Sequence, residues 1–438
     1  MTQAFTEALA EALAARAVAP ALPELGIADW RLTVDTATSV EVGLKDGLMG
    51  GPYEAPNEVT GLRGEAYVRW ADGQISRGVV DRATPEGLDA DLRTWRQAAY
   101  QDAWAPEVVG PEAVPGVPLW DAGAAGWVAG ETGPMFEILG RFAAELPAYE
   151  AERVNGSVTA VDAVRTIVTS RGFHHVGAST SVAAWAEVDG RASDGVSLRR
   201  RPEAAEIAGI IGRVGTHNRA LRQEATLVPG RQTVVLWPSA AEAMWSRYVL
   251  GNMDGQRVLT GASAFAPTQF GSGEVVLDGG LHFSLDPLRP LSAGSYAVSG
   301  EGVPARACTF IEGGRLVTPL LDLKHARKSG LSATPWPRGA TSWVLPAPSL
   351  ELEELVGTVE RGLLVLQMLG LHTQDAASGR FSLTVSQGLV IESGRLVGRA
   401  KAIIAGNFLD ALRRPVTWAQ VPGKEGLALA IKADVLPG

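Results

Sequence analysis

At 438 residues the chain is too long for one ordinary hydrophobic core, so its length predicts two domains. A hydrophobic fraction of 46% with 20% charged residues is typical of a folded globular protein and excludes a disordered chain. The net charge is −9 and no basic stripe is present, which argues against a nucleic-acid partner.

Three further observations bear on location. No apolar run approaches the roughly 18–20 residues that a membrane helix needs, so no membrane partner is expected. Phe5, Leu9 and Leu13 recur at helical spacing near the N-terminus, with Glu7 and Glu11 between them, unlike the unbroken apolar centre of an export signal. The one cysteine, Cys308, excludes a disulfide framework. A cytoplasmic location follows as the expectation.

The first half of the chain predicts strands joined by tight turns. Residues 30–43 alternate apolar and polar side chains, as a half-buried strand does. Residues 66–70 and 74–80 flank Asp72-Gly73, a dipeptide that readily adopts the positive φ of a hairpin turn. Asn155-Gly156 predicts a second hairpin for the same reason.

Helices are expected at residues 203–224 and again after Ser349, where Leu352, Leu355, Val359 and Leu363 follow with helical spacing. Short strands with glycine turns predominate in the second half. The pattern predicts an α+β protein of two domains. Residues 1–215 would form an N-terminal mixed α/β sheet domain, and residues 216–438 a β-rich domain resembling a barrel or sandwich.

An ordered series of glycine-containing segments occupies the last third of the chain. They are Glu-Gly-Val-Pro-Ala-Arg (301–306), Phe-Ile-Glu-Gly-Gly-Arg-Leu (310–316), Ser-Gly-Arg-Phe-Ser (378–382), Val-Ile-Glu-Ser-Gly-Arg-Leu (390–396) and Ile-Ile-Ala-Gly-Asn-Phe-Leu (403–409). The series resembles the C-terminal domain of the TldD/PmbA family (peptidase U62), microbial metalloproteases once named modulators of DNA gyrase. Looser matches at residues 61–73, 169–173 and 228–236 extend the resemblance over nearly the whole chain.

The resemblance fails where the family's catalytic subunit carries its zinc motif. In that subunit, TldD, a His-Glu-x-x-x-His helix holds the zinc that lowers the pKa of a bound water, and the glutamate takes the proton. None of the six histidines here is followed by glutamate, and residues 237–255 offer only Glu242 and Asp254. The family's cysteine ligand also has no counterpart. The resemblance therefore implies the other subunit, TldE or PmbA, without catalytic residues, metal ligands or cofactor.

What this resemblance implies is a metal-free, non-catalytic subunit of a cytosolic metalloprotease complex. Its partner would be a TldD-like catalytic subunit in a heterodimer, or a second copy in a homodimer. The complex would degrade unfolded or flexible peptides and mature peptide precursors. Phe381, Ser382, Gly406 and Asn407 are the candidate peptide-binding or cavity-lining residues, since glycines and an asparagine beside a strand allow close backbone approach. Tight turns in a β-rich core would explain them equally well.

Two other functions stay open. One is a self-associating peptide-binding protein with no protease partner, which a genome lacking any His-Glu-x-x-x-His homologue would favour. The other is a hydrolase that uses His372, Asp375 and Ser382, which lie within eleven residues but without the sharp Gly-x-Ser-x-Gly turn that such a nucleophile needs. His217 is expected on a solvent-exposed helix face.

Overall fold

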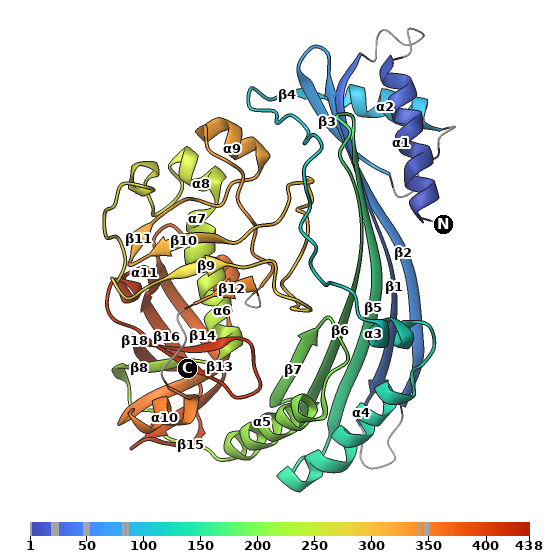
Figure 1. Cartoon of the computed structure of the whole chain (residues 1–438). Coiled ribbons are helices and arrows are strands. Elements are labelled where there is room, and N and C mark those ends of the chain that lie inside the picture. The colour runs from blue at the N-terminus through green and yellow to red at the C-terminus, as the bar shows by residue number, and fades with distance from the viewer. Residues whose placement is uncertain are drawn as a thin grey trace.

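The computed structural model describes residues 2–18, 26–46, 53–80, 84, 87–339, 342–345 and 350–438. Two lobes face each other across a long loop (Figure 1). The N-terminal lobe is a curved antiparallel sheet, and the C-terminal lobe is built around a closed barrel. The predicted α+β class with a β-rich, barrel-like C-terminal part is confirmed. None of the described helices is both long and apolar enough to cross a membrane.

The N-terminal sheet has seven strands in the order β4-β3-β2-β1-β5-β6-β7, and every neighbouring pair is antiparallel. The strands are β1 (Ile27–Leu44), β2 (Tyr53–Trp70), β3 (Gln74–Val79), β4 (Tyr100–Gln101), β5 (Val154–Thr169), β6 (His174–Val188) and β7 (Ala192–Leu198). The hairpin predicted at Asp72-Gly73 joins β2 to β3, with Gly73 at a φ of +82°.

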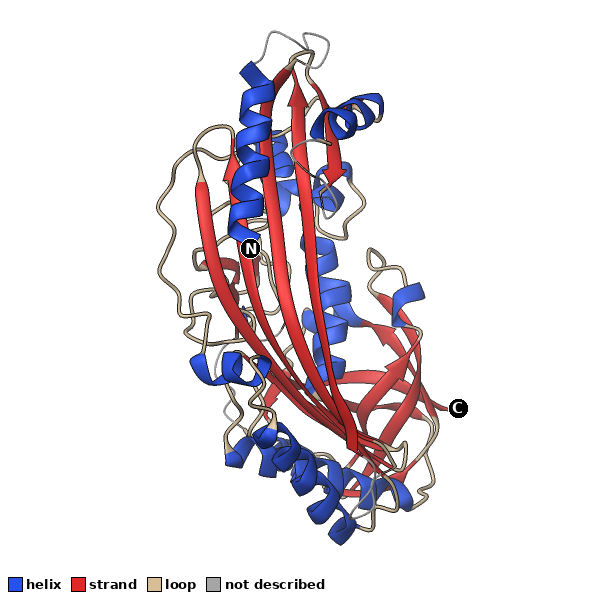
Figure 2. Cartoon of the chain, turned by 90° about the vertical axis from the view of Figure 1, so that its right-hand side faces the viewer, coloured by secondary structure: helices blue, strands red, loops and turns tan. Residues whose placement is uncertain are grey.

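The second predicted hairpin is wrong. Asn155 and Gly156 lie inside β5, paired with Glu187 and Ala186 of β6. Because β1 flanks β5 on its other side, two neighbouring strands hold this segment extended and outweigh the local turn preference of Asn-Gly. Figure 2 shows how long the resulting strands are.

Helices cover one face of this sheet and leave the other turned toward the C-terminal lobe (Figures 1 and 2). They are α1 (Thr2–Val18), α2 (Leu88–Gln97), α3 (Ala122–Val128) and α4 (Gly133–Glu145). The alternation along β1 explains the arrangement, because Leu32, Val34, Val40 and Val42 are all buried among these helices and their neighbouring strands.

Five strands of the C-terminal lobe close into a barrel in the order β13-β8-β18-β16-β14, and a β13–β14 pairing completes the ring. They are β8 (Gly230–Leu236), β13 (Arg361–Leu369), β14 (Arg380–Glu392), β16 (Ala402–Asn407) and β18 (Leu427–Pro437). Strands β15 (Arg395–Arg399) and β17 (Thr417–Gln420) extend it by pairing with β14 and β18. A four-stranded sheet contains β9 (Phe283–Leu285), β10 (Cys308–Glu312), β11 (Arg315–Leu316) and β12 (Trp343–Val344).

The remaining helices are α5 (Ala204–Arg222), α6 (Pro238–Trp245), α7 (Gly251–Met253), α8 (Gly255–Thr260), α9 (Leu323–Ser329), α10 (Leu352–Gly357) and α11 (Phe408–Leu412). Helix α10 is shorter than predicted, since Leu363 lies in β13, paired with Val234 and Val390. Its run of apolar residues is buried within the barrel, and spacing alone does not distinguish such a strand from a helix. The predicted cap, Ser349, lies outside the described residues.

Helix α5 packs against both lobes. Its Ile211 and Val214 belong to one buried apolar cluster with Val158 of β5 and Leu389 of β14. The predicted domain boundary, between residues 215 and 216, falls within this helix, and the division into two domains stays a prediction.

Candidate functional site

The helix that follows β8 occupies the place where the family resemblance expects zinc ligands. Pro238 begins α6, where its fixed φ suits the first turn and its missing N–H is not needed. The helix buries an aromatic cluster inside the lobe: the ring of Trp245 lies 5.1 Å from Phe283 and 5.8 Å from both Trp343 and Trp418. This helix is therefore held by apolar packing on its inner face.

A π-helical turn, Ser246–Leu250, interrupts the same helix, which is tied to the first residue of β14 and to the loop before it. The hydroxyl of Tyr248 donates to the carbonyl oxygen of Arg380 at 2.8 Å, and burial raises its pKa to about 12. The fully buried Asn252 donates from Nδ2 to the carbonyl oxygen of Ala376 at 2.7 Å and accepts from the amide of Ala264 at 2.8 Å. The loop is thus braced against the helix from two sides.

The residues of this helix do not fit a zinc ion. Zinc needs three or four converging nitrogen, sulfur or carboxylate ligands. Glu242 and Asp254 lie at opposite ends of the segment, and Asp254 is occupied as the cap of α8, where its Oδ1 accepts from the amide of Arg257 at 3.0 Å. Across the described ranges, no cluster of three or more histidine, cysteine or acidic side chains is placed to hold a metal. Cys308 is half-buried on β10, and burial raises the pKa of its thiol.

Two of the predicted peptide-binding residues, Phe381 and Gly406, lie opposite each other on β14 and β16. The Phe381 ring is buried, and a Cβ atom at Gly406 would lie 3.1 Å from its Cζ atom. The glycine therefore makes room for the ring, which is a packing role. Whether either residue contacts a peptide stays a prediction.

The other two, Ser382 and Asn407, stand at the surface end of the same strands. The exposed Ser382 donates its amide to Oε1 of Gln374 at 3.2 Å. Asn407 caps α11, since its Oδ1 accepts from the amide of Asp410 at 3.0 Å while Nδ2 donates to the carbonyl oxygen of Ser378 at 3.0 Å. Asn407 also lines a cavity of about 510 Å³. Its role in peptide binding is likewise a prediction.

His372, Asp375 and Ser382 do not form a triad. All three are exposed, and no hydrogen bond or ion pair joins any two of them within the described part of the chain. Oδ1 of Asp375 instead accepts a hydrogen bond from the amide of Ala377 at 3.0 Å. The arrangement lacks the oriented base that a serine nucleophile requires.

A buried charge cluster that the sequence did not suggest joins the lobes. Asp194 of β7, with a side chain only 3% exposed, accepts from Nε of Arg213 on α5 at 2.6 Å and also binds Nζ of Lys424 from the β17–β18 loop. Lys424 lies over the ring of Trp237 at 5.9 Å. Three distant segments of the chain thus share one buried carboxylate.

His217 belongs to this region, and its predicted exposure is wrong. The side chain is buried and meets the Trp237 ring edge to face, with centroids 4.7 Å apart. Burial lowers the pKa of His217 to about 4, so the imidazole is neutral at pH 7. A helical position four residues after Arg213 places both side chains on one face of α5, which is the signal that would have suggested a shared site.

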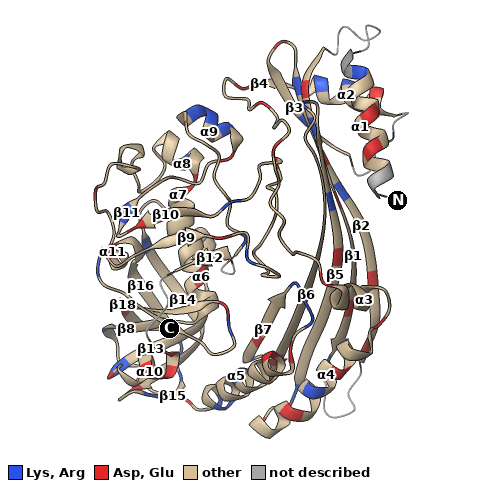
Figure 3. Ribbon diagram, viewed as in Figure 1, with Lys and Arg blue, Asp and Glu red and all other residues tan. Residues whose placement is uncertain are grey.

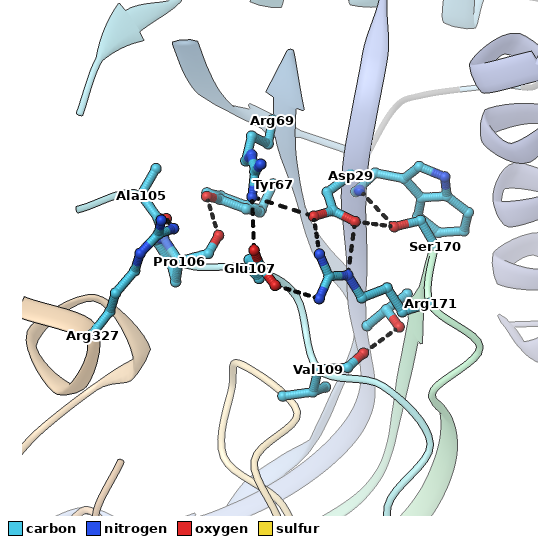
Figure 4. A network of polar contacts seen from close by, with 12 residues as sticks. Asp29, Tyr67, Arg69, Ala105, Pro106, Glu107, Val109, Ser170, Arg171 and Arg327 are labelled. Atoms are coloured by element: carbon cyan, nitrogen blue, oxygen red, sulfur yellow. Dashed lines mark hydrogen bonds and ion pairs between the residues drawn. The ribbon is translucent and has the colours of Figure 1, made fainter. Parts of the chain in front are cut away.

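A second polar network lies between the lobes at the other end of the sheet (Figure 4). Arg171 bridges Asp29 of β1 at 3.1 Å and Glu107 at 2.5 Å. The hydroxyl of Tyr67 donates to the carbonyl oxygen of Pro106 at 2.9 Å. Arg327 of α9 reaches across from the C-terminal lobe and donates to the carbonyl oxygen of Ala105. Together these contacts hold the loop after β4 in the interlobe space.

The fold places a long antiparallel sheet beside a closed five-stranded barrel, with a buried helix after the barrel strand β8. Residues 229–422 match the family described as the PmbA/TldA metallopeptidase C-terminal domain. The chain therefore carries the C-terminal domain of the TldD/PmbA family, as its motifs indicated. The whole fold is similar to that of TldE from Thermococcus kodakarensis, with a TM-score of 0.78 at 18% identity over 97% of this chain and 100% of that one.

Curated relatives carry names from both branches of the family. The chain is 26% identical over 133 residues to the Metalloprotease TldD homolog of Buchnera aphidicola (subsp. Schizaphis graminum), covering 28% of this chain and 27% of that protein. It is 30% identical over 116 residues to the Metalloprotease PmbA homolog of Buchnera aphidicola (subsp. Acyrthosiphon pisum), covering 26% of each. These alignments span about a quarter of the relatives' length.

Proposed function

We propose that this chain is the metal-free, non-catalytic subunit of a cytosolic TldD/TldE-type metalloprotease complex that acts on unfolded or flexible peptides. A TldD-like partner would supply the zinc and the general base. This chain would supply the partner interface and part of the wall around the peptide. Processing of peptide precursors is the expected biological use.

The observation that carries the proposal is the composition of the helix after β8. Residues 237–255 contain no histidine, and Met244, Trp245 and Tyr248 of this segment are buried in the apolar core. Building a zinc site here would require removing side chains that hold the helix in the barrel. The family domain is present, and packing residues stand where the resemblance expects the metal-binding residues, which supports a metal-free subunit.

The test is zinc content and peptidase activity, measured on the purified chain, on a TldD-like partner and on their mixture. We expect zinc and peptidase activity that EDTA abolishes only where the partner is present. A chain that alone contained stoichiometric zinc and cleaved peptides in an EDTA-sensitive manner would overturn the proposal.

Glu242→Gln provides a matched control for the acidic residue on the helix. The complex with this variant should retain the activity of the unaltered complex, whereas a partner whose motif glutamate is changed to glutamine should be inactive. Loss of activity with Glu242→Gln would show that this subunit takes part in the chemistry. A chain that binds peptides but never associates with a TldD-like protein would support the alternative, a self-associating peptide-binding protein.

A further inference from the structure

A small cavity lies where β7 and α5 meet the barrel. It has a volume of about 210 Å³ and is lined by residues of β6, β7 and α5 on one side and of α6, β13 and β14 on the other. Figure 3 shows acidic and basic residues on α5 and β7 at this junction of the lobes. The volume is below the roughly 300–1,000 Å³ of pockets for drug-sized ligands, so the cavity suits a smaller molecule.

The imidazole of His217 lines this cavity and lacks a hydrogen-bond partner. The residue is only 8% exposed, and among the described residues its ring contacts the Trp237 ring while neither ring nitrogen has a donor or acceptor in reach. Neither nitrogen is sealed from solvent, so the polar edge of the ring is accessible from the cavity. Buried polar groups are usually hydrogen-bonded, and this largely buried imidazole is therefore free to bind a small molecule.

Further unused donors line the same cavity. The ammonium group of Lys424 carries three N–H groups, and its one hydrogen bond within the described structure is to Oδ1 of Asp194. The side-chain amide of the half-buried Gln387 and the hydroxyl of Ser239 make no hydrogen bond to any described residue. These groups come from β14, α6 and the loop before β18, and they can all donate to one acceptor-rich ligand.

The charges around the cavity leave a surplus of one positive charge. The charged groups that act on the His217 imidazole are the carboxylate of Asp194 and the cations Arg213 and Lys424. Both oxygens of Asp194 are occupied, one by Nε of Arg213 and the other by Nζ of Lys424. Nη2 of Arg213 is buried and has no partner in the described part of the chain. A singly charged anion would neutralise this surplus, whereas a cation would find no free carboxylate oxygen.

Apolar side chains form the rest of the wall. Trp185 of β6, Trp237 before α6 and Leu366 of β13 line the cavity, and Trp185 is a large side chain left 38% exposed. Covering such apolar surface stabilises a complex in proportion to the area removed from water. An inorganic anion such as phosphate would leave this wall uncovered. An organic acid would cover the wall with its body while its carboxylate meets the donors.

We propose that this cavity is a binding site for a small organic monocarboxylate with an apolar body. The carboxylate accepts hydrogen bonds from Lys424, Gln387 and His217, and the body lies against Trp185 and Trp237. A free small acid and the C-terminal residue of a peptide share this chemistry. The inference goes beyond the proposed function and does not depend on it, because every residue that lines the cavity belongs to this chain.

The test is isothermal titration calorimetry of the full chain at pH 7 with two pairs of probes. One pair is N-acetyl-leucine and its amide, and the other is acetyl-Gly-Gly-Gly-Leu and its amide. We expect an acid to bind at least about 10-fold more tightly than its amide, because the amide lacks the charge-assisted hydrogen bonds. Binding of N-acetyl-leucine alone identifies a free small acid as the source, and binding of the peptide acid identifies a peptide C-terminus. Sodium phosphate should not compete with either.

Two variants with matched controls locate the binding. Lys424→Met keeps the length of the side chain without its charge, and Gln387→Leu removes the amide without touching the pair between Asp194 and its cations. Each should weaken binding of the acid at least about 5-fold. Lys401→Met and Gln420→Leu make the same changes at exposed positions of the barrel lobe and should bind as the native chain does. Circular dichroism checks folding, and Gln387→Leu remains a test should Lys424→Met fail to fold.

Several results would overturn the proposal. They are equal affinity for the acids and their amides, no binding of either acid at millimolar concentration, or native affinity in folded Gln387→Leu and Lys424→Met. Phosphate that binds as tightly as the acids would also overturn it, because the apolar wall would then play no part. Zinc bound to the lone chain would refute the proposed function and leave these calorimetric results unaffected, so the two failures are distinguishable.

Discussion

The sheet and the barrel differ in what they bury. Among the described residues, the buried acidic, arginine, lysine and histidine side chains are Asp29, Arg31, Asp194 and His217, and all lie on the N-terminal sheet or α5. The buried polar side chains of the barrel lobe, such as Asn252, are neutral. A barrel that closes on itself satisfies its strands internally, whereas an open sheet must be attached to its surroundings through side chains.

This difference predicts that the sheet is sensitive to charge and the barrel to apolar packing. Buried charges are costly to leave unpaired, because their desolvation is offset only by a well-placed partner. Lost packing contacts cost in proportion to the atoms removed.

Asp194→Asn should lower the free energy of unfolding by about 3–5 kcal/mol, because Arg213 and Lys424 would then face each other without the carboxylate between them. Urea denaturation measures the change. The control is Asp434→Asn, whose carboxylate lies 3.8 Å from Arg231 in an exposed pair and should matter by less than about 1 kcal/mol. Equal losses in the two variants would contradict the proposed importance of buried charge in the sheet.

His217 should make the protein less stable as the pH falls. Its folded pKa of about 4 is below the unfolded value, so the unfolded chain binds the proton more tightly. The stabilisation of the folded state that neutral His217 contributes is fully present above pH 6.5. It is lost as the pH falls to 4, which lowers the free energy of unfolding by about 3 kcal/mol. Urea denaturation at pH 7, 5 and 4 should show a weaker pH dependence for His217→Phe than for the native chain. His372→Gln, at an exposed histidine, should behave as native.

Gly215→Ala should lower the free energy of unfolding by about 1–3 kcal/mol. The new Cβ would lie 2.2 Å from Cγ of Tyr149, in the segment after α4 that packs against α5. On the same helix, Gly212→Ala meets nothing within 4 Å and should stabilise by about 0.5–1 kcal/mol through helix propensity. Thermal unfolding of both variants checks the opposite signs. A stabilised Gly215→Ala would mean that the ring of Tyr149 moves aside easily.

Tyr248→Phe should cost the barrel about 1 kcal/mol, since it removes the hydrogen bond to the carbonyl oxygen of Arg380 and keeps the ring in place. Trp245→Ala on the same helix should cost about 3–5 kcal/mol, as expected for a large buried aromatic side chain. Urea denaturation compares the two. A larger loss of stability for Tyr248→Phe than for Trp245→Ala would contradict the contrast between sheet and barrel, because the barrel would then depend more on polar contacts than on apolar packing.

The features that the sequence predicted correctly depend on near neighbours. The hairpin at Asp72-Gly73 needs only the positive φ of one glycine, and the alternation of β1 reports directly which face is buried. The motif series of the last third predicted the family domain, and the helix after β8 appeared where the resemblance placed it. The errors at Asn155-Gly156 and Leu363 arose because distant strands, β1 and β8 respectively, decide the conformation of those segments.

Some residues of the candidate site could be recognised in the sequence and others could not. The sequence singled out Phe381, Ser382, Gly406 and Asn407. The structure shows the Phe381 ring packed against Gly406 and Asn407 capping a helix, and contact of these residues with a peptide stays a prediction. Asp194, Lys424 and His217 gave no recognisable pattern, because they are separated along the chain and meet only after the lobes pack.

By itself the sequence determined the class of protein, the strand alternation and the absence of histidine from the helix after β8, since these depend on composition and local order. Only the tertiary structure decided which carboxylate is buried and which histidine is neutral. Burial and strand pairing arise from segments that lie far apart in the chain, and no local pattern records the free energy of bringing them together.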